Sequence, residues 1–137
     1  MDRSLALWRR AGAEALAAFG LVFAGCGAIV ANDHYHTALG TVGIALVFGL
    51  IIMVMVYTTG HLSGAHINPA VTVAFTLTRH FSPRDALAYI VAQLAGATLG
   101  ALVLAGIGQA SHRTSASPCR LSRPAAHSST RQSSLDS

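Results

Sequence analysis

Long apolar runs separated by short polar segments are the main pattern along the chain. The runs cover residues 11–30, 38–57 and 83–107. About 20 residues of helix, at roughly 1.5 Å of rise per residue, are as long as the hydrocarbon core of a bilayer is thick. The pattern therefore predicts three transmembrane helices. Ser82 and Pro83 are typical of the start of the third, as N-cap and first helical residue.

A shorter apolar segment, residues 69–78, lies between the second and third runs. It follows the polar stretch GHLSGAHINPA, residues 60–70. Asn68 before Pro69 predicts a helix start, with Asn as the N-cap and Pro at the first helical position. The helix would span about 15 Å, half of a bilayer. We therefore predict a re-entrant half-helix, and a turn at the membrane interface is the alternative.

The polar stretch before this half-helix has to find partners for its backbone. Irregular chain occurs at membrane depth only where protein covers it or where it lines water. The half-helix N-terminus would carry partial positive charge and free N–H donors, while the carbonyls of Gly64, Ala65 and His66 would accept. With the Asn68 amide as a further donor, such a lining favours water and small uncharged solutes and disfavours ions.

The composition agrees with a membrane protein. Of the 137 residues, 53% are hydrophobic and 10% are charged, whereas a soluble domain has about 25% charged residues. The isoelectric point is about 9.8, but there is no basic stripe with interleaved aromatic residues, so a nucleic-acid partner is not expected. No nucleophile–base pair or pair of carboxylates lies at membrane depth, so no enzymatic activity is predicted.

The arginines predict the orientation of the chain. The sequence has no Lys, and the loop 31–37 after the first run carries no Arg. The arginines that flank the runs all lie on the opposite side: Arg3, Arg9, Arg10, Arg79 and Arg84. Because basic residues concentrate in cytoplasmic loops, we predict a cytoplasmic N-terminus, residues 1–10, in a plasma or inner membrane.

The last segment, residues 109–137, differs from the rest of the chain. It is rich in Ser and Arg, so it cannot bury enough apolar surface to offset its ordering entropy, and we predict that it is disordered. Arg113 and Arg120 lie on the side where the orientation rule expects few arginines. We interpret the break in composition near residues 108–112 as the trace of a frameshift or a premature end.

Two alternative interpretations account for fewer of these features. The first run could belong to a secretory signal, but Glu14 interrupts it and its apolar length exceeds that of a signal. A membrane-anchored metal or redox protein would use His34, His36, His61 and Cys26. No carboxylate or thiolate joins these histidines at ligand spacing, so no metal or other cofactor is predicted.

The segment SGAHINPAVT, residues 63–72, resembles the first Asn-Pro-Ala signature of the aquaporin and glycerol-facilitator family, the major intrinsic proteins. The stretches AEALAAFGLVFAGCGAIV, GIALVFGLIIMVMVYTTGH and AYIVAQLAGATLGA resemble the first three helices of that family. The resemblance covers roughly residues 10–108. It is specific, because the signature occurs together with three matching helices.

The resemblance implies an all-α membrane protein in which this chain supplies three transmembrane helices and one re-entrant half-helix. They would form the first half of a six-span channel for water and small uncharged solutes such as glycerol. Members of the family typically form homotetramers with one pore per subunit. Phe48 would belong to the outer constriction of the pore. The residues implied to line the pore are Gly64, Ala65, His66, Asn68, Pro69 and Ala70.

Three polar residues in or beside the apolar runs are expected to have structural roles: Glu14, His61 and Gln93. An ionised carboxylate at the centre of a transmembrane helix costs about 2.5–3.5 kcal/mol, so Glu14 needs partners. The resemblance implies that backbone N–H groups of the polar stretch are those partners, and a side chain that reaches the cytoplasmic interface is the alternative. Gly96 and Gly100 are expected to let helices touch.

The second Asn-Pro-Ala signature and the other constriction residues of the family do not occur in this sequence. Activity of the chain by itself is therefore doubtful, and a non-conducting fragment that associates with full-length relatives is the alternative. Two copies inserted in opposite orientations could rebuild a pore, but the flanking arginines all favour one orientation.

Overall fold

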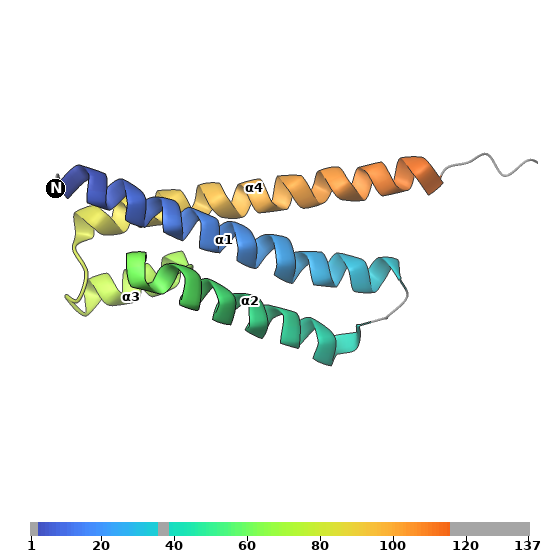
Figure 1. Ribbon diagram of the computed structural model, residues 1–137, viewed down its shortest axis with the longest axis horizontal. Coiled ribbons are helices and arrows are strands. Elements are labelled where there is room, and N and C mark those ends of the chain that lie inside the picture. The colour runs from blue at the N-terminus through green and yellow to red at the C-terminus, as the bar shows by residue number, and fades with distance from the viewer. Residues whose placement is uncertain (1–2, 36–38, 116–137) are drawn as a thin grey trace, which may run out of the picture.

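The protein is a bundle of helices. The computed structural model describes residues 3–35 and 39–115, and these residues contain no strand. The prediction of an all-α fold is therefore confirmed for this part of the chain. Figure 1 shows the order of the helices, which are α1 (Arg3–His34), α2 (Gly40–Ser63), α3 (Pro69–Leu77) and α4 (Pro83–Ser115).

Three of the helices are long and apolar enough to cross a membrane, as the hydrophobic pattern predicts. The candidate spans are Ala6–His34, Gly40–Ser63 and Pro83–Gly108, with mean hydropathies of 1.9, 2.4 and 2.0. In α2 no residue of the most apolar window is buried. An unburied helix of this hydropathy is stable in lipid and would be a liability in water, so the structure agrees with a multi-pass membrane protein.

All three long helices extend beyond the predicted spans. Helix α1 covers Arg3–His34 rather than residues 11–30. Helix α2 continues through Thr58 and Thr59, whose hydroxyls donate to carbonyls one turn earlier, at 2.7 and 2.8 Å. These bonds give each hydroxyl a hydrogen-bond acceptor within the helix, so the hydroxyls do not end it. Helix α4 continues to Ser115, so the first part of the segment predicted to be disordered is helical. Residues 116–137 of that segment lie outside the described residues.

Helix α1 lies between α2 and α4 and packs against both, while α3 packs against α4. The contact between α1 and α4 is a contact of backbones. A Cβ atom added to Gly96 would lie 2.0 Å from the carbonyl oxygen of Ala15, and one added to Gly100 would lie 2.9 Å from that of Phe19. These two glycines therefore let the helices touch, as the sequence predicts.

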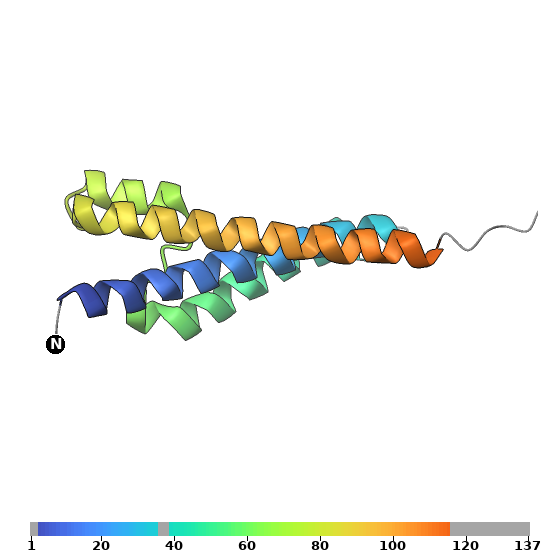
Figure 2. The same ribbon diagram turned by 90° about the horizontal axis from the view of Figure 1, so that it is seen from above.

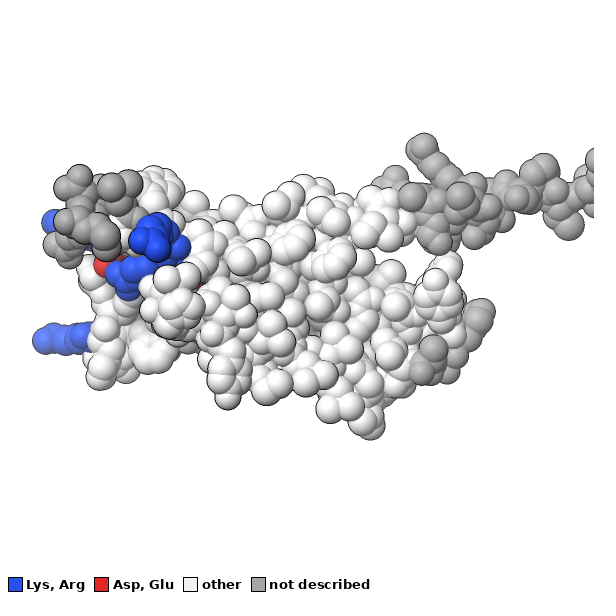
Figure 3. Space-filling model, in the orientation of Figure 1, with Lys and Arg blue, Asp and Glu red and all other residues white. Residues whose placement is uncertain are grey.

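Most of the charged side chains in the described residues lie at one end of the bundle, whereas Asp33, near the end of α1, is exposed at the other end. On the face in Figure 3 they are seen at the end where α1 and α4 begin and α3 ends. This separation is typical of a protein with one end at a membrane surface. That this end faces the cytoplasm stays a prediction.

Helices α2 and α3 lie on opposite sides of the bundle, and the short segment 64–68 joins them (Figure 2). Helix α3 begins at Pro69, as predicted, and ends at Leu77, one residue earlier than predicted. Its nine residues give a length of about 14 Å. The chain then turns through residues 78–82 and enters α4 at Pro83, also as predicted.

Candidate functional site

The segment 64–68, which joins α2 to α3, has an unusual backbone. Gly64 ends α2 in the left-handed conformation, with a φ of 88°. Ala65 and Ile67 also have positive φ angles, 48° and 60°, which are uncommon for residues other than glycine and most unfavourable for a β-branched one. The Asn68 N–H donates to the His66 carbonyl at 2.6 Å, which closes a three-residue turn on Ile67. Such a backbone persists only where its surroundings hold it.

The carboxylate of Glu14 holds this segment. Glu14 is fully buried on α1. Its Oε1 atom accepts from the Ser63 hydroxyl at 2.6 Å and from the His66 N–H at 2.9 Å. Its Oε2 atom accepts from the Ile67 N–H at 2.6 Å and from the Gln93 amide at 2.8 Å. The full burial rules out the alternative in which Glu14 reaches the interface.

Gln93 connects the same carboxylate to the start of α3. Its amide nitrogen lies 3.1 Å from the hydroxyl of Thr72, which is also fully buried. The Nδ1 atom of His66 lies 3.2 Å from that hydroxyl. The Thr72 N–H donates to the Asn68 carbonyl at 3.1 Å. The first turn of α3 is therefore fixed to α4 and to the segment before it by one buried polar network.

A second set of polar contacts ties this network to the charged end of the bundle. The Arg10 Nε atom donates to the Tyr89 hydroxyl at 2.9 Å, and that hydroxyl donates to the Ser63 carbonyl at 2.9 Å. The Arg10 guanidinium also lies 3.7 Å from the Asp85 carboxylate and over the Phe81 ring, at 5.6 Å from its centroid. Tyr89 therefore satisfies one of the free carbonyls at the end of α2.

Asn68 caps α3 in the way that the sequence predicts. Its backbone is extended, and its side-chain oxygen accepts from the Ala70 N–H at 2.9 Å. Pro69 occupies the first helical position. Asn68 and Ala70 are exposed, whereas Pro69 is half-buried. The amide NH₂ group of Asn68 is thus left to bond with something outside the cap.

The other predicted pore residues lie on the same segment. Gly64 is exposed, and Ala65 and His66 are half-buried. The His66 ring packs against the rings of Phe75, Phe81 and Tyr89, with centroid distances of 4.9, 4.9 and 5.4 Å. The His66 side chain is therefore fixed in an aromatic cluster, and its carbonyl already accepts one hydrogen bond within the turn.

Two predicted residues lie apart from this network. His61 is exposed in the last turn of α2, and no described hydrogen bond joins it to Glu14. Phe48 lies in the first half of α2, where its half-buried side chain packs against Gly25 of α1. Sequence reasoning did not find Ser63, Thr72 or Tyr89, since no local pattern distinguishes them from other polar residues of the helices.

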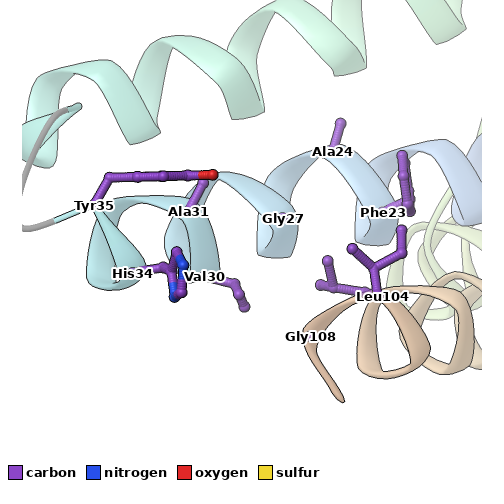
Figure 4. Close-up of a pocket in the computed structure, with 10 residues that line it drawn as sticks. Phe23, Ala24, Gly27, Val30, Ala31, His34, Tyr35, Leu104 and Gly108 are labelled. Carbon is purple, nitrogen blue, oxygen red and sulfur yellow. The ribbon is translucent and has the colours of Figure 1, made fainter. Parts of the chain in front are cut away.

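A cavity of about 410 Å³ lies between α1 and α4, near the end of α1. Figure 4 shows its apolar walls, with His34 and Tyr35 at the end of α1 beside Gly27 and Leu104. No residue of the segment 64–70 lines it. In the described part of the chain no three His, Cys, Asp or Glu side chains converge as metal ligands, and His36 lies outside that part.

A family model described as "Major intrinsic protein" matches residues 1–133 of the chain. The chain belongs to this family. The match runs beyond residues 10–108, where the resemblance of the motifs ends. A half-helix opened by Asn-Pro-Ala and held by a buried carboxylate is thus the local structure of a major intrinsic protein.

Curated members of the family are similar in sequence. Nodulin-26 of Glycine max is 51% identical over 87 residues, 64% of this chain. Aquaporin NIP3-1 of Arabidopsis thaliana is 50% identical over 91 residues, 66% of this chain, and aquaporin NIP1-1 of Oryza sativa subsp. japonica is 51% identical over 89 residues, 65% of this chain. The matches cover 32%, 28% and 31% of these relatives, so the chain spans about a third of their length.

Proposed function

We propose that this chain supplies one half of a channel for water and small uncharged solutes such as glycerol. One observation carries the proposal: a strained, irregular segment, residues 64–68, is held by a buried carboxylate directly before a half-helix. Within a membrane such a backbone is stable only where protein covers it or where it lines water. Because Gly64, Asn68 and Ala70 are exposed, we assign their exposed side to the water path.

The selectivity of the proposed path follows from the end of α3. A helix N-terminus carries about half a positive charge, and low dielectric strengthens its repulsion of cations and protons. The Asn68 oxygen is engaged by the Ala70 N–H, so its NH₂ group can donate to a passing oxygen atom. A neutral solute that both donates and accepts can exchange its water partners for these groups.

The acceptors of the proposed path are backbone carbonyls. The carbonyls of Gly64 and Ala65 receive no described hydrogen bond, whereas the His66 carbonyl keeps one lone pair beside its bond to Asn68. We therefore assign the larger part of the accepting role to Gly64 and Ala65. Phe48 is proposed as the wall of the outer constriction, and a cytoplasmic N-terminus and a homotetramer complete the proposal.

Water permeability of liposomes that contain the purified chain tests this function. If the chain conducts by itself, stopped-flow light scattering after an osmotic step shows faster shrinkage than in empty liposomes, while the proton leak stays that of empty liposomes. A Glu14→Gln variant should lose most of the increase, because it releases the segment 64–68. Permeability equal to that of empty liposomes would refute the proposal for the isolated chain.

Association with a full-length family member is a second candidate function. The observation in its favour is that polar groups of Gly64 and Asn68 are exposed beside exposed apolar side chains such as Leu62 and Val71. Exposed polar backbone is costly in lipid, so a complementary half would stabilise it. Co-purification of tagged chain with a full-length channel, together with liposomes that do not conduct, would favour this function over the first.

A further inference from the structure

Phe48 lies in a notch that a glycine of α1 creates. A Cβ atom added to Gly25 would lie 2.3 Å from Cε1 of the Phe48 ring, 2.6 Å from Cζ and 2.8 Å from Cδ1. Carbon atoms attract each other best at about 3.5–4.0 Å. The edge of the ring therefore rests on the α1 backbone, at a depth that no residue with a side chain would allow.

The glycine at position 25 matters because the side chain that packs on it is a rigid ring. Gly20, one turn and a half earlier on α1, has a comparable contact, because an added Cβ would lie 2.6 Å from the terminal carbon of Met55. A Met side chain has three rotatable bonds and can move that end aside. A phenyl ring is planar and rigid, and three of its atoms meet the added carbon. It can respond only by moving as a body away from α1.

The ring has space for this movement. Phe48 is only half-buried, so the side of the ring that does not touch α1 is open in part. A displacement of about 1 Å restores an ordinary contact distance, and neither helix has to unfold to permit it. A side chain at position 25 would thus change where the ring stands while leaving the fold intact.

We infer that Gly25 is a specificity-determining residue, which sets the width of the proposed path by fixing how far the Phe48 ring withdraws toward α1. The inference rests on the proposed function, in which Phe48 walls the outer constriction. Gly25 touches no solute and acts through Phe48, so it is a positioning residue. A side chain at position 25 pushes the ring into the path and hinders glycerol more than water.

The test is a set of variants of the full chain in proteoliposomes. Gly25→Ala should lower the ratio of glycerol to water permeability by about tenfold, the discrimination that one methylene of fit provides in a pocket. Gly49→Ala is the matched control, since it adds the same methyl group next to Phe48 on α2, where nothing lies within 4 Å. Adding Phe48→Leu to Gly25→Ala should restore the ratio, because a smaller side chain accommodates the new methyl.

A second measurement detects a change in the position of the Phe48 ring and does not require the chain to conduct. Fluorine NMR of the chain labelled with 4-fluorophenylalanine gives one resonance for each of the five Phe residues, and Phe48→Leu identifies that of Phe48. Gly25→Ala should shift this resonance and Gly49→Ala should leave it nearly unchanged. The inference is overturned if Gly25→Ala leaves the Phe48 resonance unshifted. It is also overturned if the chain conducts and Gly25→Ala leaves the ratio of glycerol to water permeability unchanged. A shifted resonance in a chain that does not conduct refutes the proposed function and supports the position of the ring.

Discussion

Replacing Glu14 with glutamine keeps the size of the side chain but turns one acceptor oxygen into a donor. In the structure each carboxylate oxygen accepts one side-chain bond and one backbone bond, the backbone donors being His66 and Ile67. The Ser63 hydroxyl can rotate and the Gln93 amide can flip, but a backbone N–H cannot change its role. Whichever way the new amide lies, it therefore faces one of the two backbone N–H groups with an NH₂ group.

The size of the effect follows from this lost bond. A hydrogen bond to a charged group contributes about 1.5–3 kcal/mol, and Glu14 is fully buried, so solvent does not screen it. Each 1.4 kcal/mol changes an equilibrium about tenfold. Opening of the segment 64–68 should therefore become about 10- to 100-fold more frequent.

Hydrogen exchange of the His66 and Ile67 amides measures this opening in the chain reconstituted in bicelles. Glu14→Gln should accelerate their exchange by the stated factor and leave the amides in the middle of α2 protected. Asp33→Asn is the matched control, because it removes an exposed carboxylate from the same helix. Unchanged exchange in Glu14→Gln, or equal acceleration in the control, would show that the carboxylate does not hold the segment.

Three further predictions concern the packing and the cap. Gly96→Ala should lower the thermal midpoint of the chain in detergent, whereas Gly106→Ala, with nothing within 4 Å of the new methyl, should not; equal midpoints would contradict the backbone contact. Tyr89→Phe should destabilise the fold by about 1–3 kcal/mol, because the Ser63 carbonyl loses its buried donor; an unchanged denaturation midpoint would argue against this. Asn68→Asp should keep the helicity by circular dichroism, since Asp also caps, but raise the proton leak of liposomes, and an unaltered leak would disprove the electrostatic barrier.

The amino-acid sequence by itself determined the helices and where two of them, α3 and α4, start. Apolar runs of membrane length, a proline at position 83 and the pair Asn68-Pro69 are local signals, because helix formation and capping depend on residues within one or two turns of each other. That Glu14 needs partners followed from the cost of a carboxylate in an apolar run, and the resemblance to the major intrinsic proteins implied that backbone N–H groups supply them. The apolar run, however, predicted too early an end for α4, because a change to polar composition does not by itself end a helix.

Only the tertiary structure decided which polar side chains complete the network. Thr72, Gln93 and Glu14 come from three different helices, and what brings them together is the packing of α4 on α1 through Gly96. The strained turn at Ile67 likewise exists because Glu14 accepts its N–H, a bond across 53 residues of sequence. Contacts of this kind depend on how helices are placed in space, and no spacing along one helix encodes them.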